Sequence, residues 1–169
     1  MPGFVMHIAI GQEYISKHSS TENYDEFILG NIDPDLTKEK YKTHYGKSPA
    51  YTSLKEFLNN NKLDSSLNKG RFLHLITDYL FYNYYLDRIS KQTLHNDYDL
   101  INMDLINKYK VILPGNIKEY VFVKEGKPEI LSLELACRVI DDISSMDINQ
   151  IEKQVKEGNK KWEFYKNLI

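Results

Sequence analysis

Residues 70–88, GRFLHLITDYLFYNYYLDR, form the stretch around which we expect the rest of the chain to fold. Its first half is apolar on nearly every side, and a helix that is apolar all round is a buried helix. Two ionisable residues, His74 and Asp78, interrupt it at a spacing of four, which places them on one face, a turn apart. An unpaired buried carboxylate is costly or becomes protonated, so Asp78 needs a partner. Two interpretations are open: a structural His–Asp hydrogen bond, or ligation of a metal ion.

The composition excludes several classes of protein. The 169 residues fit one domain with a sizeable core, residues 1–169, and the formal net charge of -2 provides no basic field for nucleic acid. The single cysteine, Cys137, rules out an internal disulfide framework and a cysteine-rich zinc site. The opening residues, MPGFVMHIAIGQEY, lack the pattern of a signal peptide, and no apolar run is long enough to span a bilayer. We therefore expect a cytoplasmic protein without stable membrane association.

Apolar residues recur at helical spacing along most of the chain, which predicts an all-α fold of about six helices. The expected helical segments are 4–17, 24–29, 49–59, a central helix from residue 65 or 66, 93–108, 133–143 and 148–169. The last segment contains Gly158 and Asn159, where a break is expected. Residues 120–131 are open to two interpretations, a small hairpin or an extended excursion. The pattern does not fix the oligomeric state.

Polar residues of the first half of the chain each have an ordinary structural explanation. His7 lies near the apolar face of the first expected helix, either as a partly buried histidine or as a ligand that points into a cleft. Pro34 stiffens a turn that presents Asp33 and Asp35, and aspartate is common in turns and at helix N-caps. His44 lies in a basic, polar segment that is expected at the surface.

The order of these residues is more specific than any one of them. Four motifs follow one another in the first half of the chain: Met1-Pro2-Gly3-Phe4 with His7, a G-x-x-x-P-D turn at 30–35, His44, and G-x-x-x-H-x-x-x-D at 70–78. In this order they resemble the zinc-dependent phospholipase C family, in its short bacterial form. The resemblance implies a single helical domain with a metal site built from residues 1–80. It also gives Gly70 a role, because glycine lets another backbone or a ligand approach closely.

The resemblance implies two zinc positions. The first would be bound by Asp35, His44, His74 and Asp78. The second would use His7 and share Asp78 as a bridging carboxylate. In secreted members of the family the second ion also takes the N-terminal amine and carbonyl, a contribution that would fall to Met1 or Pro2 here. One or two Zn²⁺ ions are therefore expected.

A third zinc position of the family requires two further histidines and a glutamate downstream of the central helix. The first of these aligns with Tyr84, so we expect the third position to be lost or rebuilt. His95, Asp97 and Asp99 are the nearby substitutes, although acidic residues near a helix start are commonly capping residues.

The chemistry of these side chains suits a metal-dependent hydrolase. Imidazole and carboxylate ligands suit Zn²⁺, which lowers the pKa of a bound water and clamps a phosphoryl group. Asp33, beside Asp35, would orient the water or act as a base, so these two are the candidate catalytic residues. A cation would absorb the developing charge, for which the candidates are Lys38, Lys47 and Arg71. We therefore predict a phosphoesterase that uses metal-activated water on a small phosphate-ester substrate.

The sequence bears differently on three alternative functions. The first is a non-catalytic helical domain of the same fold that keeps a degenerate or structural metal site. The second, an HD-type phosphohydrolase, requires an adjacent His-Asp pair, and none of the five histidines is followed by aspartate. A serine or cysteine nucleophile has no support, because Cys137 lies in an apolar helical segment and no G-x-S-x-G motif occurs.

Overall fold

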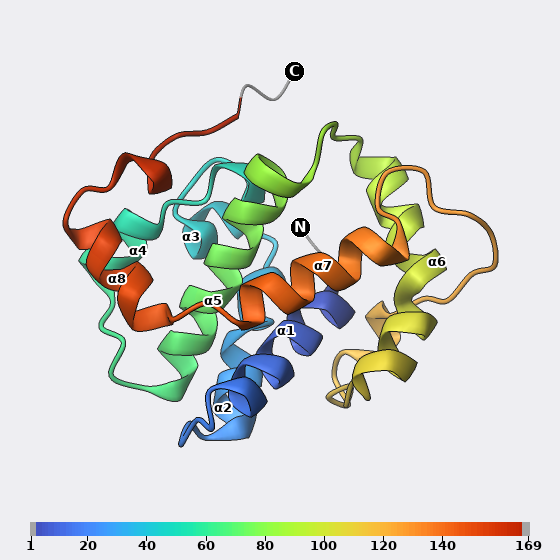
Figure 1. Cartoon of the computed structure of the whole chain (residues 1–169), viewed down its shortest axis with the longest axis horizontal. Coiled ribbons are helices and arrows are strands. Elements are labelled where there is room, and N and C mark those ends of the chain that lie inside the picture. The colour runs from blue at the N-terminus through green and yellow to red at the C-terminus, as the bar shows by residue number, and fades with distance from the viewer. Residues whose placement is uncertain (1–2, 167–169) are drawn as a thin grey trace.

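Helix α5 (Ser66–Leu80) runs through the middle of the molecule, and the other helices surround it (Figure 1). The structure is a computed structural model that describes residues 3–166. The side chain of Ser65 caps α5 by accepting a hydrogen bond from the Asn68 N–H. Every residue from Phe72 to Leu80 is buried, as the apolar pattern predicts. The helix then continues into a π-helical turn, Phe81–Tyr85, which ends at Leu86.

The described residues form eight α-helices and no strand, which confirms the predicted all-α fold. Besides α5, the helices are α1 (Phe4–Lys17), α2 (Tyr24–Gly30), α3 (Lys40–His44), α4 (Leu54–Asn60), α6 (Lys91–Tyr109), α7 (Leu133–Ser144) and α8 (Ile148–Lys156). Short 3₁₀ turns lie at Asp33–Asp35, Pro49–Tyr51, Lys118–Tyr120 and Lys160–Trp162. Within residues 3–166, none of the helices is both long enough and apolar enough to cross a membrane.

Two expected helices have different bounds in the structure. The segment expected as one helix over 49–59 is a 3₁₀ turn followed by α4, because the chain is extended at Thr52 and Ser53. There the Thr52 hydroxyl and the Ser53 N–H both donate to the His44 carbonyl and so close the end of α3. The last helix ends at Lys156, since Gly158 adopts a positive φ of 75°. Residues 167–169 of that expected helix lie outside the described residues.

The connection from 121 to 131 is the extended excursion, not the hairpin, and it returns beside α6 to the start of α7 (Figure 1). The buried Asp97 carboxylate accepts hydrogen bonds from the N–H groups of Glu129, Ile130 and Leu131, at 2.8–2.9 Å. A side chain of α6 therefore satisfies backbone donors that a hairpin would have paired with a second strand.

A crossing of two glycines brings α2 and α5 into backbone contact. A Cβ atom added at Gly70 would lie 2.2 Å from the Phe27 carbonyl oxygen, and one at Gly30 would lie 2.1 Å from that of Leu67. The expected close approach at Gly70 is thus confirmed, and the partner is the backbone of α2. The crossing places Asn31, which follows α2, against His74 on α5.

The glycine crossing predicts the effect of adding one methyl group. Gly70→Ala should lower the free energy of unfolding by about 2 kcal/mol or more, because the added methyl group would collide with the backbone of α2, which cannot move aside. Gly115→Ala is the control, since nothing lies within 4 Å of its Cβ position, and it should leave stability unchanged. Urea unfolding followed by circular dichroism measures both variants. Equal stability of Gly70→Ala and wild type would contradict the close packing of these helices.

Candidate metal centre

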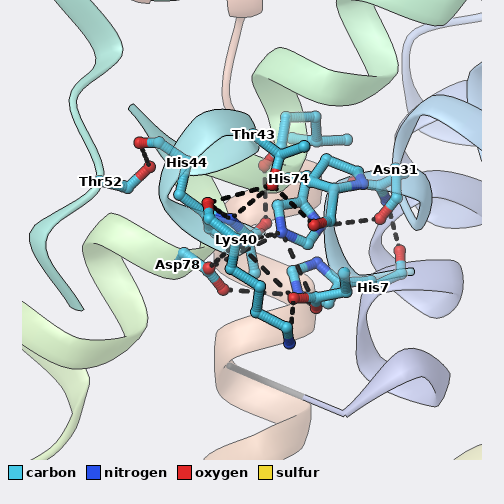
Figure 2. Close-up of polar contacts among 12 residues, drawn as sticks. His7, Asn31, Lys40, Thr43, His44, Thr52, His74 and Asp78 are labelled. Atoms are coloured by element: carbon cyan, nitrogen blue, oxygen red, sulfur yellow. Dashed lines mark hydrogen bonds and ion pairs between the residues drawn. The ribbon is translucent and has the colours of Figure 1, made fainter. Parts of the chain in front are cut away.

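Four separate elements deliver the five side chains that the sequence predicts as metal ligands. They are His7 from α1, Asp35 from the 3₁₀ turn, His44 from the end of α3, and His74 and Asp78 from α5. The structure brings them together in one buried cluster, and each side chain is 0% exposed (Figure 2). This cluster of five is called the His/Asp cluster below.

Asp78 lies between the three histidines, with one carboxylate oxygen near His7 and the other near His44 and His74. Its Oδ1 is 3.5 Å from His7 Nε2. Its Oδ2 is 3.1 Å from His44 Nε2 and 3.7 Å from His74 Nε2. Each carboxylate oxygen therefore faces the ring of a histidine from a different part of the chain.

Asp35, at the end of the 3₁₀ turn, lies near the same three histidine rings. Its Oδ1 is 3.6 Å from His44 Nε2, and its Oδ2 is 3.9 Å from His7 Nε2 and 3.8 Å from His74 Nε2. The Lys40 ammonium donates to Oδ1 at 2.9 Å. Lys40 is the one lysine that contacts a carboxylate of the cluster among the described residues.

Hydrogen bonds to backbone carbonyls fix the orientation of two rings. His44 Nδ1 lies 3.0 Å from the Lys40 carbonyl, and His74 Nδ1 lies 3.0 Å from the Asn31 carbonyl. A carbonyl oxygen only accepts, so each Nδ1 carries the hydrogen and each neutral ring presents a lone pair at Nε2. Metal-binding histidines typically have this arrangement, in which the second nitrogen is anchored by an acceptor.

Nitrogen and oxygen atoms of the five side chains lie close together at the centre of the cluster. His44 Nε2 and His74 Nε2 are only 3.1 Å apart, although both are acceptors in the neutral rings. His7 Nε2, Asp35 Oδ2 and both oxygens of Asp78 are buried and have no hydrogen-bond partner among the described residues. Such groups are costly in a protein interior, and a bound cation would satisfy all of them.

The spacing of these atoms also fits a metal ion. The separations between histidine nitrogens and carboxylate oxygens run from 3.1 to 3.9 Å, mostly longer than a hydrogen bond. Ligands held at about 2.0–2.1 Å from a tetrahedral zinc ion are about 3.4 Å from one another. The cluster therefore has the residue types and the spacing of a zinc site before any rearrangement.

The donor atoms form two overlapping groups, His7/Asp35/His74 and His44/His74/Asp78, each within 4.8 Å. His74 belongs to both, and one ring nitrogen binds one ion. The arrangement fits a single central ion, or two ions that share Asp78 through its two oxygens. The amine and carbonyl of Met1 and Pro2, which the phospholipase C resemblance would add, lie outside the described residues.

His74 and Asp78 have the protonation states that metals bind. Burial, reinforced by His7, lowers the pKa of His74 to about 3, so its ring is neutral near pH 7. Burial raises the pKa of Asp78, but the surrounding histidines outweigh it and hold that pKa well below its ordinary value. For His44, burial lowers the pKa, but the nearby carboxylates of Asp78 and Asp35 outweigh it and give a net rise, which favours the protonated ring while no cation is bound. An ionised Asp78 and a neutral His74 are ready ligands.

Asp33, the other candidate catalytic residue, is engaged elsewhere. Arg71 donates from Nε to both Asp33 oxygens, at 3.1 and 2.9 Å, and from Nη2 to one of them. Burial raises the pKa of Asp33, and Arg71 partly offsets the rise. This ion pair lines a separate surface hollow of about 190 Å³. A catalytic role for Asp33 stays a prediction, and it would require the carboxylate to leave Arg71.

Two of the three cations predicted from the sequence, Arg71 and Lys47, are occupied by other groups, and Lys40 lies beside the cluster. Arg71 binds Asp33, and the Lys47 ammonium lies 4.1 Å from the centre of the Tyr51 ring. The sequence contained a signal for Lys40 that was missed: it lies four residues before His44, hence on the same face of a helix. The contact of His74 with the Asn31 carbonyl had no such signal, because any residue can supply a carbonyl.

The substitutes considered for a third zinc position are not gathered into a further cluster. Asp97 is bound by three backbone N–H groups, and Asp99 pairs with Lys124 at 2.8 Å. His95 lies beside the ring of Tyr98. Tyr84 is 48% exposed and donates to the Lys161 carbonyl.

His95 lines two cavities, neither of which is lined by a residue of the cluster itself. One of about 320 Å³ is mostly apolar and is lined by Lys40, Ala50, Tyr82 and Leu94 among others. Because Lys40 also contacts Asp35, this cavity lies next to the cluster. The second, of about 350 Å³, is lined by Tyr98 and the first turn of α1.

The convergence of lone pairs predicts that the fold is stabilised by metal. Zn²⁺ or Co²⁺ at about 100 times its dissociation constant should add about 2.7 kcal/mol to the free energy of unfolding, and a chelator should remove this gain. Asp78→Asn should weaken binding at least about tenfold, because it removes a charged ligand. His18→Ala should bind as wild type, since His18 is exposed and its ring donates to the Ser144 carbonyl. Thermal unfolding with and without added metal measures all three proteins, and no response in wild type would contradict the site.

No protein-family model matches this chain, and no curated protein or solved structure matches it either. The resemblance to the zinc-dependent phospholipase C family therefore stays a prediction, based on the order of residues in the first half of the chain.

Proposed function

We propose that this protein is a metal-dependent hydrolase, specifically a phosphoesterase that uses one or two Zn²⁺ ions. One observation carries the proposal: three imidazoles and two carboxylates, all fully buried, direct their lone pairs into one place. The cost of assembling these groups is explained if they hold a cation, and three or more nitrogen and oxygen ligands of this kind are typical of zinc.

A zinc ion in this position would lower the pKa of a bound water and neutralise charge on a phosphoryl group. The side chains of the chain have distinct roles around it. His44, His74 and Asp78 would hold the ion, with both rings pre-oriented by backbone carbonyls. Asp35 would be a ligand through Oδ2, which has no hydrogen-bond partner among the described residues, and its Oδ1, held by Lys40, would accept a proton from the attacking water.

Lys40 extends this chemistry towards the substrate. Its ammonium contacts Asp35, and its side chain lines the cavity of about 320 Å³. A phosphate ester in that cavity would meet a positive charge at the edge of the cluster, where it offsets the charge that develops on phosphorus oxygens. The size of the cavity suits a small phosphate ester, and the phospholipid specificity of the resembled family does not transfer.

The complete burial of the cluster favours a second candidate function, a helical domain with a structural metal ion. Structural zinc sites are closed by protein ligands, whereas catalytic ones keep a position open for water or substrate. All five side chains are 0% exposed, and together they join α1, the Asp35 turn, α3 and α5. An ion there would stabilise the fold without any turnover.

Hydrolysis of generic phosphate esters separates the two candidates. Wild type loaded with Zn²⁺ should hydrolyse p-nitrophenyl phosphate or bis(p-nitrophenyl) phosphate, and chelation should abolish the reaction. His74→Ala should lower the melting temperature under both candidates, but only the phosphoesterase loses activity with it. Metal-loaded wild type without turnover on either ester would leave the structural ion as the function.

Replacing Lys40 tests its proposed contact with the substrate. Lys40→Met should keep the bound metal and lower kcat/KM at least about tenfold, because a charge that stabilises the transition state is lost. Lys42→Met is the matched control on the same short helix, since Lys42 pairs with the exposed Glu39 at 2.8 Å, and it should retain full activity. Metal content and initial rates are measured on the same samples. Equal kcat/KM for the two variants would exclude the role of Lys40.

A further inference from the structure

Tyr98 on α6 has a buried hydroxyl that no described residue satisfies. The residue is 6% exposed, and its hydroxyl has no hydrogen-bond partner among residues 3–166. A phenylalanine would pack in the same space without the cost of an unpaired hydroxyl. The orphaned hydroxyl therefore points to a partner that does not belong to the described chain.

The position of Tyr98 relates it to the His/Asp cluster. A Cβ atom added at Gly3 would lie 3.2 Å from Cγ of Tyr98, so the ring packs on the N-terminal end of α1. His7 lies one turn further along α1, on the same face as Gly3, and its N–H donates to the Gly3 carbonyl. Tyr98 is therefore next to the turn that carries the least anchored histidine of the cluster, since neither ring nitrogen of His7 has a partner among the described residues.

The electrostatics of the hydroxyl agree with this placement. Burial raises the pKa of Tyr98 well above its ordinary value, and the charges of Asp78 and Asp35 raise it further. The phenol is thus protonated at any physiological pH and acts as a donor. Other atoms of the Tyr98 side chain line the cavity of about 350 Å³ beside the first turn of α1, so the buried hydroxyl lies behind a cavity that can admit a ligand.

We propose that the Tyr98 hydroxyl donates a hydrogen bond to the phosphoryl group of the substrate, on the His7 side of the His/Asp cluster. This assignment rests on the proposed phosphoesterase function and adds to it a neutral donor besides the charged one at Lys40. A donor preorganised in a buried site stabilises charge on phosphoryl oxygens more effectively than water does.

The role of Tyr98 is tested with inorganic phosphate as the probe and Co²⁺ as the reporter metal. Phosphate is titrated into Co²⁺-loaded protein, and the visible absorption of the ion is followed together with turnover of p-nitrophenyl phosphate. Tyr98→Phe should keep the affinity for Co²⁺ within about threefold, weaken phosphate binding at least about tenfold and lower kcat about 10- to 100-fold. Its melting temperature should equal or exceed that of wild type, because no described hydrogen bond is removed.

Tyr109→Phe is the matched control on the same helix. Its hydroxyl donates to the Cys137 carbonyl and to Asp141, at 3.3 and 3.1 Å, so its loss should lower the melting temperature and leave phosphate binding unchanged. Phosphate affinity and turnover of Tyr98→Phe equal to wild type would overturn the role of Tyr98 alone. A wild-type protein that binds no Co²⁺ would overturn the metal site, and the role of Tyr98 with it.

Discussion

Lone pairs that face one another in the interior are the constraint on which this structure depends. In their neutral forms the rings of His44 and His74 each donate their only N–H to a backbone carbonyl, and their Nε2 atoms, which would both be acceptors, lie 3.1 Å apart. The Asp78 carboxylate, fully buried, adds negative charge to the same place. Such an arrangement repels itself unless a cation lies within it. The proposed metal binding would therefore be coupled to folding, because the ligands come from four elements that the ion would join.

The scaffold around the cluster is built to hold these lone pairs in place. Gly30 and Gly70 let the backbones of α2 and α5 touch, and that contact sets the Asn31 carbonyl against the ring of His74. The hydrogen bonds that close α3 fix its last residue, His44, from the other side. Packing between helices thus determines which nitrogen of each ring is available to a ligand. An ordinary helical core would require neither the paired glycines nor the buried histidines.

Much of this could be predicted from the sequence, and the failures have identifiable physical causes. The central helix was evident because an apolar stretch interrupted only by His74 and Asp78 is typical of a buried helix. The grouping of His7 with that pair came from residue order, since spacing within one helix carries no information about distant elements. The contact of Lys40 with Asp35 depends on a short helix that the polar composition of its segment concealed. The path of 121–131 is set by Asp97, a tertiary contact that local propensity does not encode.

The surroundings of the cluster distinguish a reactive centre from a structural one more sharply than the ligands do. A purely structural ion requires only that its ligands be closed off and that the remaining contacts be apolar. Here a lysine ammonium lies against Asp35 on one side, next to a cavity. On the side of α1, a buried phenol without a partner lines a second cavity. Because a charged and a neutral donor both accompany a site that could dispense with them, the arrangement is better explained by an anionic ligand that uses both.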